Sequence, residues 1–318
     1  MTNHAVLGRF APSPSGRMHL GNVFAGMLAW LSARAAGGAI LLRIEDLDTM
    51  RCTQAFADLL REDLRWLGLD WDFESPPQHT RSEAYTAALR QLETMGLIYP
   101  CWCSRGVLHA ASAPHASDGH AIYPGLCREL TAAERAAHTA PPSMRLIVPD
   151  EEIAFTDGLQ GPYRENLAKE CGDFVLRKAD GVYAYQLAVV VDDADAGVTQ
   201  VVRGRDLLGS TARQLYLYRL LDRPAPDYWH VPLLTGPGGR RLSKRDLDLD
   251  LGVLRRSVTP EQLLGVLAWH AGLLDRPEPA SARELTEIFS WDKIRCEDVE
   301  LDLSLLLPEA VQAGSARA

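Results

Sequence analysis

Apolar and turn-forming positions in residues 5–50 alternate in a pattern of strand, loop, helix and strand. Residues 5–10 (AVLGRF) form a short apolar run that leads into the turn APSPSG, which predicts a buried strand. From His19 apolar residues recur at helical spacing up to the pair Gly37-Gly38, where glycine favours a helix end. Residues 39–46 (AILLRIED) predict a second buried strand. Such a unit predicts a parallel α/β sheet.

The middle of the chain contains two helical patterns and one passage without periodicity. Residues 54–67 and 82–95 carry apolar side chains at helical spacing and predict two helices. Residues 99–142 are rich in Ala, His, Ser and Pro, and we interpret them as part of an insertion. The valine-rich residues 182–208 predict strands, with a turn at 195–197.

The last third of the chain combines a basic loop with helices. Residues 230–246 (HVPLLTGPGGRRLSKRD) predict a strand followed by a glycine-rich loop that carries several cations. The chain after Pro260 has helical patterns and contains no internal repeat.

The composition restricts the class of protein. With 318 residues, 47% hydrophobic and 24% charged, the chain is expected to be globular with more than one domain. A net charge of -9 argues against a uniformly basic surface, although the arginines of 203–213 and 240–245 leave room for local contact with nucleic acid. No apolar stretch predicts a signal peptide or a membrane span, so we expect a cytoplasmic protein without a membrane partner.

The turn APSPSGRMHLGN places three residues where a strand passes into a helix: Gly16, His19 and Gly21. Free N–H groups and the positive dipole end of a helix N-terminus suit the phosphates of ATP. His19 would donate to the α-phosphate in a transition state, and Gly21 would leave room for adenine. The alternative is a simple tight turn, with His19 as an ordinary surface residue.

The basic segment RLSKR (residues 241–245) is the second candidate for ATP chemistry. Cations in a loop suit a pyrophosphate whose charge increases as it leaves. Lys244 is the best candidate for a contact that strengthens in the transition state. Alone, such a segment is usually a solvated turn, and its value comes from being paired with the first motif.

Three of the six cysteines lie close together in the insertion, at Cys101, Cys103 and Cys127. Three thiolates in a reducing compartment favour Zn²⁺ over disulfides. No open coordination position or general base is evident, so we expect a structural rather than a catalytic zinc. Free buried cysteines without metal are the alternative. Candidates for a fourth ligand include His109, His115 and His120.

In order along the chain, the segments RFAPSPSGRMHLGN, LLRIEDLDTMR, AYQLAVVVDD, VVRGRDLL and RLSKR resemble class I glutamyl-tRNA synthetases. HLGN stands in place of the His-Ile-Gly-His signature of this family, and RLSKR in place of Lys-Met-Ser-Lys-Ser. Asn22 replaces the second histidine of the first signature, so its amide would have to donate instead. Arg241 replaces the first lysine of the second signature, which keeps the charge and changes its geometry.

The resemblance covers residues 5 to about 275 and implies a Rossmann-type catalytic domain. Its halves would be residues 1–98 and 173–255, separated by a zinc-containing insertion at 99–172. A short helical C-terminal segment, 256–318, follows. Within the family, the chain resembles the short paralogues without an anticodon-binding domain, because 256–318 is too short for that domain.

The resemblance also implies the residues of the site. Glu45 would bind the ammonium of glutamate, while Arg9 and Arg203 would bind carboxylate oxygens. Tyr185 would donate a hydrogen bond that helps to set the length of the substrate. An ion pair between Arg9 and Glu45, strand packing of Tyr185, and capping of a following helix by Asp46 and Asp48 are the alternatives. The expected glutamate-binding residues are Arg9, Ala11, Ser13, Glu45, Tyr185 and Arg203.

The remaining site residues follow from the same resemblance. His19 and Lys244 are expected to be catalytic, and Tyr123 is proposed as a fourth zinc ligand beside Cys101, Cys103 and Cys127. The expected ATP-binding residues are Gly16, His19, Gly21, Asn22, Arg241, Ser243 and Lys244.

The implied reaction uses ATP with Mg²⁺ to activate L-glutamate as glutamyl-adenylate. In the short paralogues a hydroxyl of the cyclopentenediol ring of queuosine, at the wobble position of tRNA(Asp), then accepts the glutamate. Two alternatives remain: a truncated synthetase that charges a tRNA 3′ end, and a non-catalytic zinc module that binds RNA or protein.

Overall fold

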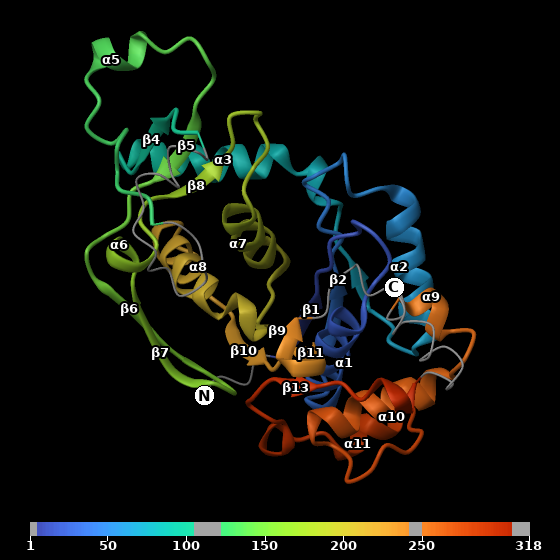
Figure 1. Ribbon diagram of the computed structural model, residues 1–318. Helices are drawn as coiled ribbons and strands as arrows, with labels where there is room; N and C mark the ends of the chain where they lie inside the picture. Colours follow the sequence, from blue (N-terminus) through green and yellow to red (C-terminus); the bar gives the residue numbers. More distant parts are fainter. Residues whose placement is uncertain (1–4, 105–121, 242–249, 307–318) are drawn as a thin grey trace.

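The computed structural model describes residues 5–104, 122–241 and 250–306, and a five-stranded sheet lies at its centre (Figure 1). The strand order is β10-β9-β1-β2-β3, and all neighbouring strands are parallel. The strands are β1 (Leu7–Phe10), β2 (Ala39–Leu42), β3 (Phe73–Glu74), β9 (Gln200–Gly204) and β10 (Asp227–Val231). The predicted parallel α/β sheet is therefore confirmed.

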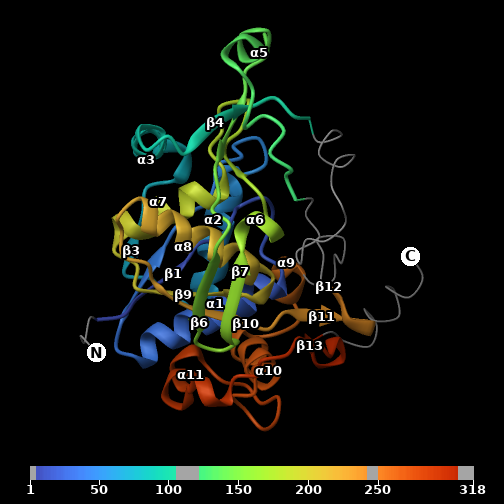
Figure 2. The ribbon, with the colours of Figure 1, turned by 90° about the vertical axis from the view of Figure 1, so that its left-hand side faces the viewer.

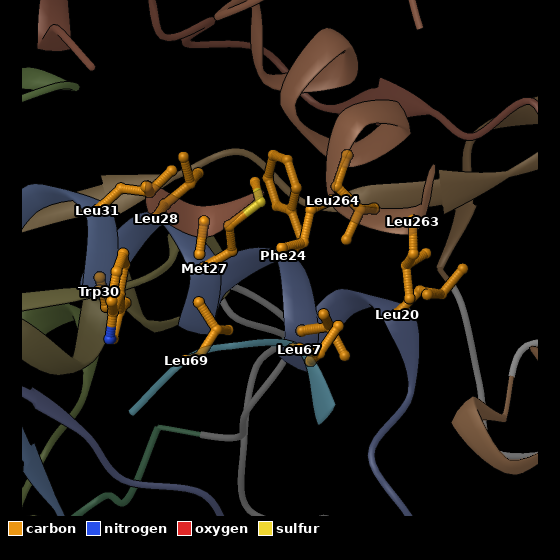
Figure 3. Close-up of a cluster of buried hydrophobic side chains, with 14 of the residues drawn as sticks. Leu20, Phe24, Met27, Leu28, Trp30, Leu31, Leu67, Leu69, Leu263 and Leu264 are labelled. Carbon is orange, nitrogen blue, oxygen red and sulfur yellow. The ribbon is translucent and has the colours of Figure 1, made fainter. Parts of the chain in front are cut away.

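Helix α1 (Leu20–Ala35) connects β1 to β2 and is apolar over most of its surface. It packs on the sheet with one side and on the C-terminal helices with the other, which leaves little of it in contact with water. Figure 3 shows Leu20 and Phe24 of α1 beside Leu263 and Leu264. Burial of each such side chain contributes about 1.5–3 kcal/mol. The other helices of this region are α2 (Gln54–Trp66), α10 (Pro260–Ala271) and α11 (Ala282–Ile288).

The prediction of strands throughout residues 182–208 is wrong in its first half. Residues Tyr185–Ala196 form helix α7, which ends where Gly197 adopts a φ of 70°, so only the predicted turn and the strand β9 are confirmed. The valines lower helix propensity slightly, but α7 packs between α3 (Ser82–Thr94) and α8 (Leu208–Leu220), where its apolar residues are buried. Tertiary burial outweighs the weak local preference.

The chain between α3 and α7 forms an arm with its own small sheets (Figure 2). A hairpin of this arm returns to the central sheet, where the amide of Gly158 donates to the carbonyl of Tyr228 across 2.8 Å. This hairpin therefore fixes the position of β10. The elements are β4 (Ile98–Cys101), α5 (Ala132–Ala136), β5 (Ser143–Leu146), β6 (Glu152–Asp157), β7 (Gly161–Asn166), α6 (Leu167–Glu170) and β8 (Phe174–Arg177).

The end of the described chain is helical, as predicted, and also contributes a strand that was not predicted. Strand β13 (Val299–Glu300) pairs with β11 (Leu234–Gly236), which also pairs with β12 (Arg240–Arg241). The short helix α9 (Leu251–Leu254) precedes α10. Among the described residues, no helix is long and apolar enough to cross a membrane.

Candidate active site

A cavity of about 480 Å³ opens at the carboxyl ends of β1, β2, β9 and β10. Ligand sites of open parallel sheets lie at this edge, and the volume suits a small molecule. Segments far apart in the sequence meet here, as the resemblance implied. The expected site residues that line the cavity are Arg9, Ala11, Ser13, Gly16, His19, Gly21, Asn22, Glu45, Tyr185 and Arg203.

The loop after β1 leads directly into the N-terminus of α1. His19 is the N-cap residue of α1, and its carbonyl accepts from the amides of Asn22 and Val23 at 2.9 and 3.2 Å. The first turn of α1 contains no acidic residue, so the positive end of the helix dipole is not offset there. A Cβ on Gly21 would lie 3.1 Å from the His19 ring. Gly21 therefore lets the imidazole lie over the first turn, which is a role additional to the predicted room for adenine.

Arg203 extends from β9 into the cavity, and each hydrogen bond that the structure gives it goes to an uncharged group. The side chain is buried, so its charge is poorly screened by water. A buried guanidinium that pairs with no carboxylate among the described residues is well suited to bind a carboxylate ligand. The acceptors of these bonds are His230 Nε2, Tyr185 Oη, Gln214 Oε1, the carbonyl of Leu207 and Thr211 Oγ1.

Tyr185 lies at the first position of α7, so the alternative that it packs on a strand is wrong. Its hydroxyl accepts from Arg203 Nη1 across 3.4 Å. The tyrosine and the arginine therefore line the same side of the cavity, and the hydroxyl hydrogen can point toward a ligand.

Arg9 and Glu45 both line the cavity, but each has a different ionic partner. Arg9 Nε lies 3.6 Å from Asp193 Oδ1, while Glu45 Oε1 accepts from Arg43 Nη2 at 3.1 Å. The expected alternative of a direct Arg9–Glu45 pair is therefore wrong. Arg43 is fully buried and also donates to Asp193 at 2.5 Å. Burial raises the pKa of Glu45 above its ordinary value, although the charges of Arg43 and Arg9 oppose this effect.

Asp192 anchors α7 to the segment before α3. It accepts from Gln78 Nε2 at 2.7 Å, from Arg81 Nε at 2.6 Å and from the Tyr85 hydroxyl. Sequence reasoning missed this set of buried charges. The available signal was that the acids of VVVDDAD and the arginine of LLRIED interrupt apolar runs, where a charge is buried only when it is paired.

The acids after β2 do not cap a helix that starts at Thr49. Asp46 accepts from the amide of His79 at 3.0 Å and lies 2.5 Å from His79 Nδ1, so it holds the turn before α3. Thr53 caps α2 instead, through its side-chain oxygen. Asp48 pairs with Arg51 at 3.7 Å in an exposed turn.

The second signature lies only partly within the described residues. Arg241 belongs to β12, where its register partner is Thr235 of β11. Ser243 and Lys244 lie outside the described residues.

The three clustered cysteines of the insertion converge on Tyr123. Their sulfur atoms lie within 4.8 Å of one another, with Cys103 and Cys127 3.5 Å apart. The Tyr123 hydroxyl lies 3.5 Å from the sulfur of Cys101 and 3.9 Å from that of Cys103. Tetrahedral zinc, with bonds of about 2.3 Å to sulfur and about 2.0 Å to oxygen, places sulfur and oxygen ligands about 3.5 Å apart. The group therefore fits a zinc ion. The alternative candidates for the fourth ligand, His109, His115 and His120, lie outside the described residues.

Burial and neighbouring thiols also favour a cation in this cluster. Burial, with the hydrogen bond to Cys127 and the charge of Cys101, raises the pKa of Cys103 to about 12. A divalent cation would offset the cost of deprotonating Cys103, because metal ligation stabilises thiolates. The guanidinium of Arg145 covers the Tyr123 ring, with 3.8 Å from its Cζ to the ring centroid.

The model of the family "tRNA synthetases class I (E and Q), catalytic domain" matches residues 5–268. The chain belongs to this family, and the predicted class of enzyme, a ligase of the class I synthetase type, is confirmed. Within the family it groups with proteins named glutamyl-Q tRNA(Asp) synthetase. The one from Symbiobacterium thermophilum is 50% identical, over 98% of this chain and 100% of the relative. The one from Nitratidesulfovibrio vulgaris is 48% identical, over 90% of this chain and 92% of the relative.

Solved structures show the same architecture. The glutamate tRNA ligase of Elizabethkingia meningosepticum, solved in complex with its amino acid, has a TM-score of 0.81 and 26% identity. The match covers 95% of this chain and 68% of that ligase. The glutamate-tRNA synthetase of Elizabethkingia anophelis matches with a TM-score of 0.82 and 26% identity, over 95% of this chain and 69% of that one.

Proposed function

We propose that the chain uses ATP to activate L-glutamate as glutamyl-adenylate and transfers the glutamate to the cyclopentenediol of queuosine at the wobble position of tRNA(Asp). The observation that carries the first half is Arg203, a buried guanidinium that faces the cavity and whose hydrogen-bond partners among residues 5–104, 122–241 and 250–306 are all uncharged. The names of the relatives that match this chain over most of its length support the second half.

The charges around the cavity suit glutamate. Arg9, Arg203 and Glu45 all line the cavity, so its charged groups include partners for both carboxylates and for the ammonium of glutamate. In the proposed complex Glu45 receives the ammonium, and Arg9 and Arg203 receive the carboxylates.

In the first step, an oxygen of the α-carboxylate of glutamate attacks the α-phosphorus of ATP. The new bond is a mixed anhydride, the bond from the α-phosphorus to the bridging oxygen breaks, and pyrophosphate leaves with the electron pair. His19 and the free amides of α1 would donate to the phosphate oxygens, with Gly16, Gly21 and Asn22 lining the same loop. Mg²⁺ bound to the phosphates would offset their negative charge.

The second signature is proposed to act on the leaving pyrophosphate. Lys244 would contact it in the transition state, and Arg241 and Ser243 would help to bind the phosphates. The amide of Asn22, at the position of the second histidine in the first signature, would provide a further donor at the cavity.

In the second step, a hydroxyl oxygen of the cyclopentenediol attacks the carbonyl carbon of the adenylate. An ester forms, AMP leaves with the electron pair of the anhydride bond, and the hydroxyl proton passes to AMP or to water. A base of an anticodon loop can be turned out of its stack into such a pocket, as is usual in the recognition of single-stranded RNA.

A structural zinc is proposed for the insertion, with Cys101, Cys103, Tyr123 and Cys127 as ligands. Zinc would join β4 to residues 122–128, to which the Cys101 sulfur already donates a hydrogen bond at the Tyr123 hydroxyl. It would supply folding energy at this point and no step of the reaction.

Two assays with the purified chain test the proposed function. Glutamate-dependent exchange of pyrophosphate into ATP tests adenylate formation, and its absence would contradict the activation step. Transfer of labelled glutamate to tRNA(Asp) that contains queuosine, compared with the same tRNA without it, tests the acceptor. Equal labelling of both, with the labelling of the tRNA without queuosine lost when its 3′-terminal diol is first oxidised by periodate, would instead identify a synthetase that charges the 3′ end.

A further inference from the structure

His230 lies on β10 as the register partner of Arg203 on β9, and its side chain is fully buried. Arg203 Nε donates to His230 Nε2 across 3.0 Å. On the other side of the ring, His230 Nδ1 lies 2.6 Å from Oδ2 of Asp157 at the end of β6. The three side chains thus form a continuous hydrogen-bonded chain from the β6–β7 hairpin to the cavity.

The partners of Asp157 determine which nitrogen of His230 carries hydrogen. Oδ1 of Asp157 accepts from the backbone amides of Leu159, Gln160 and His230, at 3.0, 2.8 and 3.1 Å. Although burial raises the pKa of Asp157, the hydrogen bonds from the His230 ring and from the amides of Gln160 and His230 bring it below its ordinary value. The carboxylate therefore only accepts, so His230 Nδ1 donates to it. Because Arg203 Nε always carries hydrogen, Nε2 of His230 must be the acceptor.

We propose that His230 and Asp157 are positioning residues for the recognition of glutamate. Asp157 holds His230 as the neutral tautomer with hydrogen on Nδ1, and Nε2 of His230 then orients the guanidinium of Arg203 toward the carboxylate of the substrate. Neither residue lines the cavity, so both act through Arg203. The inference rests on the proposed function of that cavity.

Protonation of His230 would reverse this arrangement. The charged groups that face the ring are Arg203 on β9, Arg9 on β1 and Asp157 on β6, and the Thr211 hydroxyl of α8 lies 3.1 Å from Nε2. Burial and the two arginines lower the pKa of His230 below 6.5, against the opposing effect of Asp157. A second N–H at Nε2 would point a donor and a positive charge at Arg203. The arrangement is therefore lost as the pH falls through the lowered pKa of His230.

Three variants separate positioning from packing. His230→Gln keeps an acceptor within reach of Arg203 Nε, whereas His230→Leu removes it at similar volume. In Asp157→Asn, the three backbone amides require the side-chain oxygen, so the NH₂ group faces Nδ1 and forces hydrogen onto Nε2 of His230. In the serine protease triad, the corresponding Asp→Asn change keeps the geometry but also leaves the histidine in the wrong tautomer.

In glutamate-dependent ATP–pyrophosphate exchange, we expect His230→Leu and Asp157→Asn to raise KM for glutamate at least about tenfold. KM for ATP should change less than about twofold, and His230→Gln should stay close to the wild type. On acidification below pH 6.5, through the lowered pKa of His230, the ratio of the glutamate KM of the wild type to that of His230→Gln should rise. Protonation of Glu45 weakens binding in both proteins and cancels in this ratio.

Nitrogen-15 chemical shifts of the histidine rings provide a readout independent of activity, with His230 assigned by its absence in His230→Gln. We expect hydrogen on Nδ1 in the wild type and on Nε2 in Asp157→Asn; the opposite tautomer in the wild type would overturn the inference. Equal KM increases in His230→Leu and His230→Gln, in proteins with unchanged circular dichroism, would also overturn it. A wild type without glutamate-dependent exchange would contradict the proposed function itself, while the nitrogen shifts would still test the tautomer.

Discussion

The guanidinium of Arg17 makes two hydrogen bonds to the fully buried carboxylate of Asp63, from Nε at 3.1 Å and from Nη2 at 2.8 Å. Arg17 belongs to the loop that lines the cavity, and Asp63 belongs to α2. Asp63 Oδ1 also accepts from Arg255, which follows α9, at 2.8 Å. One carboxylate thus joins the first signature loop to the chain that follows the second signature.

We expect Asp63→Asn to lower the free energy of unfolding by about 3 kcal/mol, because it removes the buried carboxylate that pairs with two guanidinium groups. Urea unfolding followed by circular dichroism measures this change. Asp58→Asn is the matched control on the same helix, since Asp58 is exposed and pairs with Arg61 at the surface. The control should change stability by less than about 0.5 kcal/mol. Equal losses in both variants would contradict a special role for Asp63.

Metal content tests the cysteine cluster. We expect about one equivalent of zinc per chain by elemental analysis, and its loss in Cys103→Ser together with a lower melting temperature. Cys296→Ser, at an exposed cysteine away from the cluster, should keep both the metal and the melting temperature. A wild-type protein that is folded and active without metal would show that the cluster consists of free thiols.

Tyr123→Phe should weaken zinc retention against a chelator if the hydroxyl, 3.5 Å from Cys101 Sγ, is a ligand.

The close approach of Gly21 to His19 gives a test of the first signature. In Gly21→Ala the new Cβ would meet the imidazole at 3.1 Å and displace it from the first turn. We expect the maximal rate of pyrophosphate exchange to fall about tenfold, because a hydrogen bond to the reacting phosphate is worth that much or more. Stability should not fall, since alanine favours a helix over glycine by about 0.5–1 kcal/mol.

Gly209→Ala is the matched control for this substitution. Gly209 is the second residue of α8, as Gly21 is of α1, and an added Cβ there would have no neighbour closer than 3.8 Å. The control should gain similar helix stability without a loss of rate. If both variants lose rate equally, the orientation of His19 does not limit adenylate formation.

The sequence was sufficient to predict the parallel sheet and the place of the cavity. The turn APSPSG before His19 and the acids after β2 are local signals, and the rule that ligand sites lie at the carboxyl ends of parallel strands predicts that they share one site. The ten expected residues that line the cavity could therefore be named from the sequence. Their roles remain proposals, and Ser243 and Lys244 lie outside the described residues.

The parts that sequence reasoning missed depend on contacts between distant segments. Whether Arg9 pairs with Glu45 or with Asp193 is decided by α7, which was predicted as a strand because its valines are β-branched. The His230–Asp157 contact joins positions 73 residues apart, through a hairpin whose docking on β10 has no local signature. Charged residues within apolar runs were the one available signal. They indicate that charges are buried, but they do not show which of the charged residues pair with each other.

His270 of α10 gives the fold a dependence on pH that is separate from the cavity. Burial, with the charge of Arg295, lowers its pKa below 6.5, and its Nε2 accepts from the amide of Asp302 at 3.4 Å. Between the lowered pKa of folded His270 and its ordinary value of 6.5, the unfolded chain binds more protons, so the free energy of unfolding falls as the pH decreases through this interval. We expect His270→Gln to flatten the slope of this free energy between pH 7.5 and 5.5, measured by urea unfolding. A slope as steep as that of the wild type would show that other groups carry the acid sensitivity.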